Sequence, residues 1–443
     1  MADHSKKNAN VIVSATWIFT ADDQGRLLKD HSVVIQDDII IDLLPTESVF
    51  DFYDSNEVYS LSGHILIPGL INTHTHSAMS LLKGYANDLP LAQWLNDYIW
   101  PAEKKYINPR FVKDGSMIAI SEMIKAGITT FNDMYFYPDS TAQAATELGI
   151  RANIGLIVMD FSTNYANDPQ DYLTKGFEFR DQWRDADLIT TCIAPHAPYS
   201  VSNDAFELIG TYAEQLDLSV HTHLHETEWE VNESVRQYGV SPIQRLDGLG
   251  LLGPNLMAAH CVHLNDQDFN LLSQNNVHVI HNPSSNMKLG SGIADLSTMI
   301  DHDINICLGS DSSASNNRLD ILEEMRLASL LAKGERMDPQ FLSSEQVLRM
   351  ATIHGAKAIG LESKIGSIEK GKKADIVALN LDSIECQPSY DPIATLVYSS
   401  SRADVNYVWI NGKIKLKENN LVGIDTEKIL YLAKSWQTKI QTT

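Results

Sequence analysis

The sequence predicts an α/β protein, namely a (β/α)8 TIM-like barrel together with a small β-sandwich domain that both ends of the chain form. One observation is the length of 443 residues, which accommodates a barrel of about 250 residues and a smaller second domain. A second is the alternation of short β-branched runs with helical segments across residues 67–361, a pattern typical of parallel α/β folds. A third is that residues 1–66 and 362–443 are instead rich in β-type runs and turns.

Residues 1–66 are expected to contribute the N-terminal part of the β-sandwich. Their β-type runs are separated by polar, turn-forming residues, as strands of a sheet are. The runs are 11–19, 32–35 and 39–44, with a turn at 22–25. Residues 362–443 are expected to supply the C-terminal part, in which Asn411-Gly412 follows a β-type run and signals a type I′ hairpin. A terminal helix is predicted near residues 425–437.

Residues 67–361 are predicted to form the barrel. Strand-like runs alternate here with helix-like segments, as the repeated strand–helix unit of a parallel barrel requires. The eight runs are 65–71, 128–131, 152–158, 188–193, 219–224, 256–259, 277–280 and 304–308. The helix-like segments include 111–126, 141–148, 204–215 and 319–331.

Polar residues that can bind a metal or transfer a proton follow almost every predicted barrel strand. They are His74, His76, Asn132, Asp133, His196, His223, Glu226, His260, His281 and Asp311. The loops at the carboxyl ends of barrel strands build the active site. These side chains are therefore expected to meet at one end of the barrel.

A metal site is predicted from four of these residues. His74 and His76 are two apart, so on an extended strand their side chains point to the same side. With His223 and Asp311 they make three imidazoles and one carboxylate, a set that suits Zn²⁺ or Fe²⁺ and leaves a position for water. The alternative is that all four are polar core residues satisfied by backbone groups.

Proton transfer is predicted at residues beside this metal site. Asp311 and His260 would orient the attacking water and accept its proton, and Glu226, three residues after His223, would carry a proton onto a ring nitrogen of the substrate. In the alternative interpretation, Glu226 is an N-terminal helix residue that the helix dipole favours. His225 lies beyond its strand end and is expected to have a loop or packing role.

Charge and cysteine content exclude several classes of protein. The chain has 34 Lys+Arg against 57 Asp+Glu, a net charge of −23, and no basic cluster, so nucleic acid and anionic membranes are not expected partners. Its 4 cysteines are far apart, which suits a reduced, cytoplasmic protein. No run approaches the roughly 18 apolar residues of a membrane helix.

Five sequence blocks resemble the amidohydrolase superfamily. They are PGLINTHTH (68–76), HLHE (223–226), AAHCVHL (258–264), HNPSSNMKLGSGIA (281–294) and GSDSSASNN (309–317). Within the superfamily, the chain is most similar to the methylthioadenosine/S-adenosylhomocysteine deaminases and to the related triazine hydrolases. The likeness runs along nearly the whole chain.

This resemblance implies a zinc-dependent aminohydrolase, which acts on a C–N bond of a cyclic amidine. The implied substrates are the adenine nucleoside thioethers 5′-methylthioadenosine and S-adenosylhomocysteine, which would yield the inosine analogues and ammonia. The implied ligands of a single zinc are His74, His76, His223 and Asp311, because the fourth strand ends without the lysine that bridges two metals in other members. Glu226 would protonate the purine and His260 would bind the hydrolytic water. A homo-oligomer is also expected.

The resemblance also implies three substrate contacts, from Glu103, His196 and Arg151. Glu103 would bind the ribose hydroxyls, His196 would contact the substrate, and Arg151 would bind the homocysteine carboxylate. A second arginine found in some members is missing from residues 161–167, which favours methylthioadenosine, or both substrates. In the alternative interpretations, Glu103 is a solvated helix residue and Arg151 is an ion-pair partner of an acidic loop.

Two other functions are compatible with parts of the pattern. One is an aminohydrolase or chlorohydrolase that acts on another heterocycle, such as guanine or an s-triazine. Glu103 favours the nucleoside, because a bare heterocycle has no diol for a carboxylate to bind. The other is a scaffold that has lost its chemistry, which the complete set of predicted ligands argues against. The cytidine-deaminase type of zinc site is excluded, because it needs a P-C-x-x-C segment.

Overall fold

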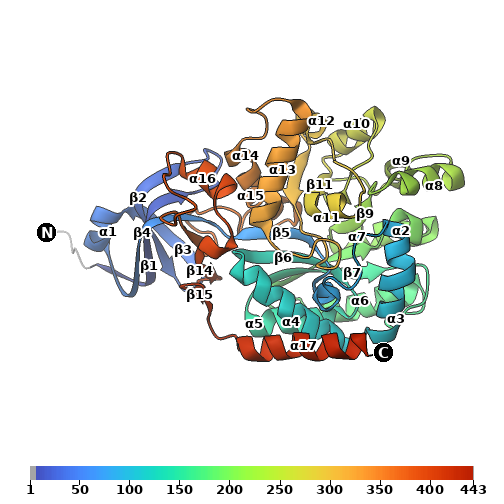
Figure 1. Cartoon of the computed structure of the whole chain (residues 1–443), viewed down its shortest axis with the longest axis horizontal. Helices are drawn as coiled ribbons and strands as arrows, with labels where there is room; N and C mark the ends of the chain where they lie inside the picture. The colour runs from blue at the N-terminus through green and yellow to red at the C-terminus, as the bar shows by residue number, and fades with distance from the viewer. Residues whose placement is uncertain (1–5, 443) are drawn as a thin grey trace.

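The computed structural model describes residues 6–442, which form two sheets of eight strands each. In the first sheet the strands are parallel and neighbours in sequence, in the order β5 to β12. Helices surround this sheet, and the second sheet lies at one side of it (Figure 1). The predicted barrel and the predicted accessory sheet are both confirmed.

The barrel strands end close to where the sequence predicts. They are β5 (Leu70–Thr75), β6 (Ile128–Tyr135), β7 (Arg151–Val158), β8 (Ile189–Pro195), β9 (Val220–Leu224), β10 (Leu256–His260), β11 (His278–His281) and β12 (Asn305–Leu308). Just beyond β12, the Asp311 backbone N–H donates to the His74 carbonyl oxygen over 2.9 Å. This bond joins the last strand to the first, so the sheet closes.

One predicted strand, at residues 65–71, is wrong in its extent. β4 (Tyr53–Pro68) belongs to the second sheet, and β5 begins only at Leu70. Pro68 has no N–H to continue a ladder, and a side chain at Gly69 would clash with Thr129, whose Oγ1 lies 2.0 Å from an ideal Cβ position. The chain therefore passes here from one sheet to the other.

Most helices of the barrel begin at capping side chains. The Asn108 side chain accepts the N–H groups of Arg110 and Phe111 before the first long helix, and such caps satisfy N–H groups that have no partner within the helix. The helices around the barrel are α4 (Pro109–Lys125), α5 (Pro138–Leu148), α6 (Pro169–Trp183), α7 (Asn203–Leu216), α8 (Glu228–Tyr238), α9 (Pro242–Gly248), α10 (Asp266–Gln274), α11 (Pro283–Lys288), α12 (Leu296–Asp301), α13 (Ile321–Arg336), α14 (Ser344–Met350) and α15 (Ile353–Ala358). Two short helices, α2 (Leu91–Gln93) and α3 (Trp100–Tyr106), lie in the long segment after β5.

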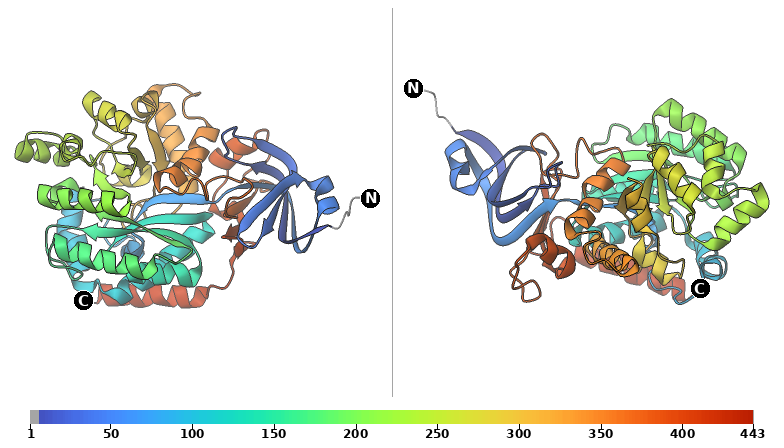
Figure 2. Two further views of the ribbon diagram at one scale, coloured as in Figure 1. Left: turned by 180° about the vertical axis from the view of Figure 1, so that it is seen from behind. Right: turned by 90° about the horizontal axis from the view of Figure 1, so that it is seen from above.

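The second sheet joins the two ends of the chain. Its strands are β1 (Lys7–Phe19), β2 (Leu27–Gln36), β3 (Ile39–Pro45), β4, β13 (Ile376–Asn380), β14 (Val405–Ile410), β15 (Lys413–Lys417) and β16 (Asn420–Leu421). β13 pairs antiparallel with β4, which connects the C-terminal strands to the N-terminal ones (Figure 2). The Asn411-Gly412 hairpin is confirmed, since both residues have positive φ, 51° and 75°, as a type I′ turn requires. The domain boundaries near residues 66 and 361 stay a prediction.

The terminal helix α17 (Thr426–Gln441) packs on the barrel rather than on the second sheet (Figure 1). The ring of Trp436 meets that of Phe111 on α4 edge to face, with centroids 5.2 Å apart. Its Nε1 donates to Asp114 Oδ2 over 2.8 Å. The chain thus returns to the barrel after completing the sheet.

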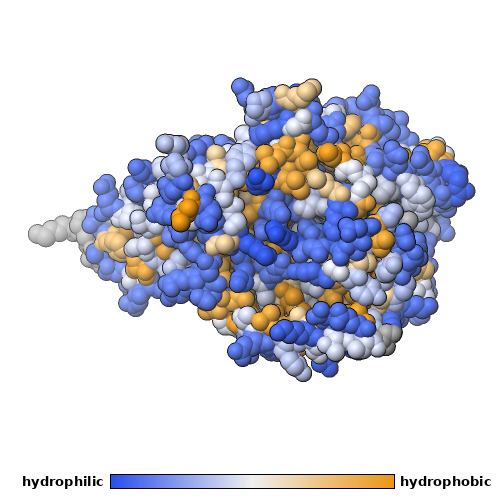
Figure 3. All heavy atoms as spheres, in the orientation of Figure 1, coloured by the Kyte–Doolittle hydropathy of each residue, from blue (hydrophilic) through white to orange (hydrophobic). Residues whose placement is uncertain are grey.

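The surface seen in Figure 3 is mostly hydrophilic, with hydrophobic residues in separate areas. This agrees with a chain that carries a net charge of −23. Within residues 6–442, no helix combines the length and the apolar character that crossing a membrane would require.

Candidate metal centre and substrate cavity

The four predicted metal ligands converge at the carboxyl ends of the barrel strands. His74 Nε2 lies 3.4 Å from Asp311 Oδ1, and His76 Nε2 lies 3.3 Å from the same oxygen. The Nε2 atoms of His76 and His223 are 3.2 Å apart. Ligand atoms at about 2.0–2.1 Å from a tetrahedral zinc are roughly 3.3–3.4 Å from one another. The observed distances therefore match the edges of a zinc coordination shell.

The hydrogen bonds around the histidines leave nitrogen lone pairs that face the centre. His76 Nδ1 donates to the Met134 carbonyl and His223 Nδ1 donates to the His196 carbonyl, each over 2.6 Å. With both rings neutral, the two Nε2 atoms carry lone pairs that face each other, an arrangement that a cation between them stabilises. His74 Nε2 is buried and has no hydrogen-bond partner. This donor set fits a divalent metal ion.

His260 also offers a possible ligand atom, because one ligand atom each of His74, His223, His260 and Asp311 lie within 4.8 Å of one another. We favour His76, because its Nε2 makes the shorter approaches of 3.2 and 3.3 Å to His223 and Asp311. His260 Nδ1 donates to Asn286 Oδ1 over 2.7 Å, which leaves Nε2 as an acceptor. That buried Nε2 has no partner and lies 3.9 Å from Glu226 Oε2. It can therefore accept a hydrogen bond from a water molecule beside the metal.

Asp311 is held by a serine of α11 and by residues of the loop after β12. Its Oδ2 accepts hydrogen bonds from Ser285 Oγ at 2.6 Å and Ser315 Oγ at 3.1 Å, and its Oδ1 accepts the Ser312 N–H. Burial alone would raise the pKa of this carboxyl, but the neighbouring His74 and a second histidine hold the pKa well below its usual range. Asp311 is therefore a carboxylate over the physiological range of pH.

The alternative interpretation makes Glu226 an N-terminal residue of a helix, but Glu226 lies just before α8. The N-cap of α8 is Thr227, so Glu226 lies outside the helix, and its side chain lines the cavity. Burial raises the pKa of Glu226, and nearby His260 opposes that rise. Ser291 Oγ donates to Glu226 Oε1 over 3.4 Å. A buried carboxyl with a raised pKa is suited to donating a proton.

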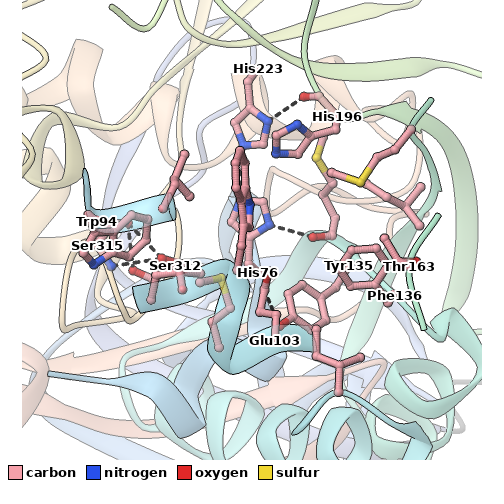
Figure 4. Close-up of a pocket in the computed structure, with 18 of the residues that line it drawn as sticks. His76, Trp94, Glu103, Tyr135, Phe136, Thr163, His196, His223, Ser312 and Ser315 are labelled. Carbon is pink, nitrogen blue, oxygen red and sulfur yellow. Dashed lines mark hydrogen bonds between the residues drawn. The ribbon is translucent and has the colours of Figure 1, made fainter. Parts of the chain in front are cut away.

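The cavity at this end of the barrel has a volume of about 600 Å³. One part of its wall is apolar and comes largely from the segment after β5 and the loop after β7. This apolar part comprises Trp94, Leu95, Trp100, Met159, Phe161 and Leu289. Figure 4 shows His76, His196 and His223 on the metal side, with Glu103 and Tyr135 further along the wall. The cavity is large enough for a nucleoside.

Glu103 and His196 line this cavity, as predicted substrate contacts should. The Tyr135 hydroxyl donates to Glu103 Oε1 over 2.7 Å. Burial raises the pKa of Glu103 to about 7, although the Tyr135 hydrogen bond opposes it. Burial also lowers the pKa of His196 to about 3, so its ring is neutral.

Arg151 does not reach the cavity, and the prediction that it binds substrate is wrong. It is the first residue of β7, so it lies at the amino end of the barrel, opposite the metal ligands. Its Nε is 3.1 Å from Asp375 Oδ2, and both side chains are almost fully buried. Its Nη2 donates to Asn411 Oδ1 over 3.3 Å. Arg151 therefore links the barrel to the second sheet. This agrees with the alternative interpretation that Arg151 is an ion-pair partner.

Sequence reasoning missed the residues that orient the predicted ones. Asn286, which orients His260, and Ser285, which binds Asp311, lie in the block of residues 281–294. Their polar character in the short segment after β11, which forms α11, is the only local signal. Which metal-site residue each one contacts depends on the fold.

Comparison with known proteins agrees with this geometry. The model of the amidohydrolase family matches residues 65–415. The chain belongs to the amidohydrolase family. A 5-methylthioadenosine/S-adenosylhomocysteine deaminase of Saccharophagus degradans is 43% identical, over 99% of this chain and 98% of that protein. A 5′-deoxyadenosine deaminase of Methanothermobacter thermautotrophicus is 40% identical, over 92% and 94%.

Solved structures share the whole fold of this amidohydrolase. The crystal structure of an adenosine deaminase from Xanthomonas campestris with bound zinc has a TM-score of 0.97 and 39% identity, and covers 99% of this chain and 100% of its own. The atrazine chlorohydrolase of Arthrobacter aurescens, complexed with zinc, has a TM-score of 0.89 and 24% identity, and covers 96% and 99%. The second likeness shows the fold alone.

Proposed function

We propose that this amidohydrolase is a zinc-dependent deaminase of adenine nucleosides with a 5′ thioether or another small 5′ group. It replaces the exocyclic amine by oxygen and releases ammonia. The observation that carries the proposal is the placement of the metal ligands, Glu226 and Glu103 around one cavity. Relatives named as deaminases of methylthioadenosine, S-adenosylhomocysteine and 5′-deoxyadenosine support it.

Zinc would be held by His74, His76, His223 and Asp311, one ion per subunit. When bound, zinc lowers the pKa of a coordinated water to about 7, so that hydroxide is available at neutral pH. The distances between the ligand atoms and the lone pairs that face the centre support this assignment.

The chain's own residues would handle the protons. His260 Nε2 orients the water, and Asp311 accepts the proton released as the water oxygen bonds to the ring carbon that bears the amine. Protonated Glu226 donates to the adjacent ring nitrogen, so that no negative charge builds up on the ring. Asp311 then passes its proton to the amine, which leaves as ammonia. As the new carbonyl forms, its hydroxyl proton returns to Glu226.

Substrate recognition would be divided between Glu103 and the apolar wall. A carboxylate can accept both hydroxyls of the ribose diol. The apolar wall suits a methylthio group better than an amino-acid tail, since a buried charge without a partner is costly. Arg151 lies elsewhere, and among the described lining residues Lys104 is the one Lys or Arg. The proposal therefore favours methylthioadenosine over S-adenosylhomocysteine.

The experiment that tests the function is a deamination assay on zinc-loaded protein. Methylthioadenosine, S-adenosylhomocysteine and adenosine are compared by the ultraviolet shift that accompanies conversion of adenine to hypoxanthine. Methylthioadenosine is expected to have the highest kcat/KM. If the zinc-bound protein deaminates none of the three, the nucleoside assignment is overturned. Heterocycles such as guanine or s-triazines then become the candidate substrates.

Metal removal is expected to abolish activity, and His76→Ala is expected to lower the bound zinc well below one ion per chain. Each imidazole supplies one of the four bonds of the shell, and losing it opens the site. Metal content by plasma mass spectrometry measures this directly. The matched control is His31→Ala, a half-buried histidine of β2 in the second sheet, which should leave zinc unchanged. Equal zinc in both variants would contradict the ligand assignment.

Glu103→Gln is expected to lower kcat/KM for nucleosides by about 10- to 100-fold, the value of hydrogen bonds to a charged group. Burial raises the pKa of Glu103 to about 7, so the ionised form that binds the diol prevails only above that pH. Wild-type KM should therefore fall as pH rises through 7, and the variant should lose this dependence. A 2′,3′-dideoxy substrate is the control. An equal loss on that substrate would argue against binding of the diol.

The proposal also includes a cytoplasmic location and a homo-oligomeric state. The described cysteines, Cys192, Cys261, Cys307 and Cys386, are buried and unpaired, as in proteins of reducing compartments. Light scattering coupled to size-exclusion chromatography tests the oligomeric state. A monomer at micromolar concentration would count against that part of the proposal.

A further inference from the structure

The reaction proposed above makes no use of a second buried carboxyl close to Glu226. Glu230 lies in the first turn of α8 and is 2% exposed. Its Oε1 accepts the backbone N–H of His225 over 3.1 Å, and its Oε2 accepts the backbone N–H of Glu226 over 2.8 Å. Both oxygens are thus bound to the turn that carries Glu226.

This arrangement differs from an ordinary helix cap. A glutamate at this position usually bonds the backbone N–H of the N-cap residue itself, which here is Thr227. The Glu230 carboxylate instead reaches past Thr227 to the two preceding residues. The N-cap is formed separately, since Thr227 Oγ1 accepts the Glu230 N–H over 3.3 Å. The carboxylate therefore serves the turn before the helix rather than the helix.

The turn needs such support because its backbone is strained. His225 has a φ of +55°, a left-handed conformation that costs a residue with a side chain about 1–2 kcal/mol. Strained conformations persist only where the surroundings hold them. The His225 ring is bonded on both sides, since Nδ1 donates to the His263 carbonyl and Nε2 accepts the Ile243 N–H. Glu230 holds the backbone of the same turn, because its carboxylate accepts the N–H groups of His225 and Glu226.

The two carboxyls also influence each other's protonation. Burial and the nearby charge of Glu226 raise the pKa of Glu230 to about 7, and its backbone hydrogen bonds oppose this rise. Like charges at close range disfavour each other. The two N–H donors favour the ionised form of Glu230, in which both oxygens accept a hydrogen bond.

We propose that Glu230 is a positioning residue of the reaction, which holds the Glu226 turn in the cavity through its bonds to the two N–H groups. The inference rests on the proposed function, because it assigns Glu230 a task only if Glu226 transfers a proton. It predicts that removing Glu230 impairs catalysis through Glu226 and not through the metal.

The test is a double-mutant cycle with Glu230→Gln and Glu226→Gln. Gln keeps one acceptor but turns an NH₂ group toward the other backbone N–H. Glu230→Gln alone should lower kcat by about 10- to 100-fold, the usual cost of losing an orienting contact, with little change in KM. In the Glu226→Gln background it should cause almost no further loss, because residues that act as a unit are not additive.

Three controls separate this role from a structural one. Glu228→Gln removes the same charge from an exposed position in the same turn of α8 and should leave kcat unchanged. Zinc content should equal that of the wild type in every variant. If Glu230→Gln does not fold, Glu230→Asp replaces it in the cycle, because Asp keeps the charge but falls short of the turn.

The outcomes distinguish this inference from the function on which it rests. Additive losses in the cycle, or an unchanged kcat in Glu230→Gln, would overturn the positioning role while wild-type activity leaves the deaminase standing. A loss confined to zinc binding or to KM would overturn it as well. If the wild-type enzyme with zinc bound has no deaminase activity, the proposed function and this inference are overturned together.

Discussion

Replacing Glu226 by Gln is expected to lower kcat for nucleoside deamination by about 10²- to 10⁴-fold, the range for loss of a general acid. Gln has nearly the same shape and can hydrogen-bond a ring nitrogen, but it cannot give up a proton. The ultraviolet assay with methylthioadenosine measures the loss. Since Glu226 is not among the predicted ligands, zinc content should stay at the wild-type value.

Asp311→Ala is the informative comparison for Glu226→Gln. Asp311 is both a predicted ligand and the predicted acceptor of the water proton, and its Oδ1 lies within 3.4 Å of two histidine nitrogens. Its loss should therefore reduce zinc content as well as activity. If Glu226→Gln also lost zinc, or kept more than a tenth of the wild-type kcat, Glu226 would not be the acid of the reaction.

The metal ligands could be predicted from sequence because a local pattern specifies them. His74 lies on β5 and His76 directly follows this strand, and the carboxyl ends of parallel barrel strands meet at one rim. A residue at the end of a recognisable strand is therefore placed without knowledge of packing. His223 and Asp311 follow the same rule, and the structure brings all four together.

The substrate role of Arg151 came from the family resemblance and not from its position. The predicted strand at residues 152–158 already places Arg151 before its strand, at the end opposite the predicted site. As the first residue of β7 it lies at the opposite rim from the cavity. Its partner Asp375 is 224 positions away in the chain, so no local sequence pattern predicts the ion pair.

The residues that orient the site were also beyond sequence reasoning. Glu230 looks like an ordinary first-turn helix acid, and only the fold shows that its oxygens bind the residues before the N-cap. The break at Gly69 is similar, because residues 65–71 form one apolar run that two sheets share. Periodicity reports local conformation, whereas these features depend on contacts between distant segments.

Replacing Arg151 by Met is expected to destabilise the protein by about 3–5 kcal/mol, the cost of leaving a buried charge without its partner. The Arg151 and Asp375 side chains are 5% and 2% exposed. Water therefore cannot solvate the Asp375 carboxylate when the arginine is lost. Urea unfolding followed by circular dichroism measures the loss. The KM values for methylthioadenosine and S-adenosylhomocysteine should not change in the folded variant, because Arg151 lies at the far rim of the barrel.

The double variant Arg151→Met/Asp375→Leu provides the control. It removes both charges and should recover much of the lost stability, since a buried ion pair replaced by apolar groups is often close to neutral. A selective rise in KM for S-adenosylhomocysteine in Arg151→Met would contradict the structural role and restore the arginine to the substrate. Destabilisation that persists equally in the double variant would instead show that Arg151 acts through its bond to Asn411 and its packing, not through the ion pair.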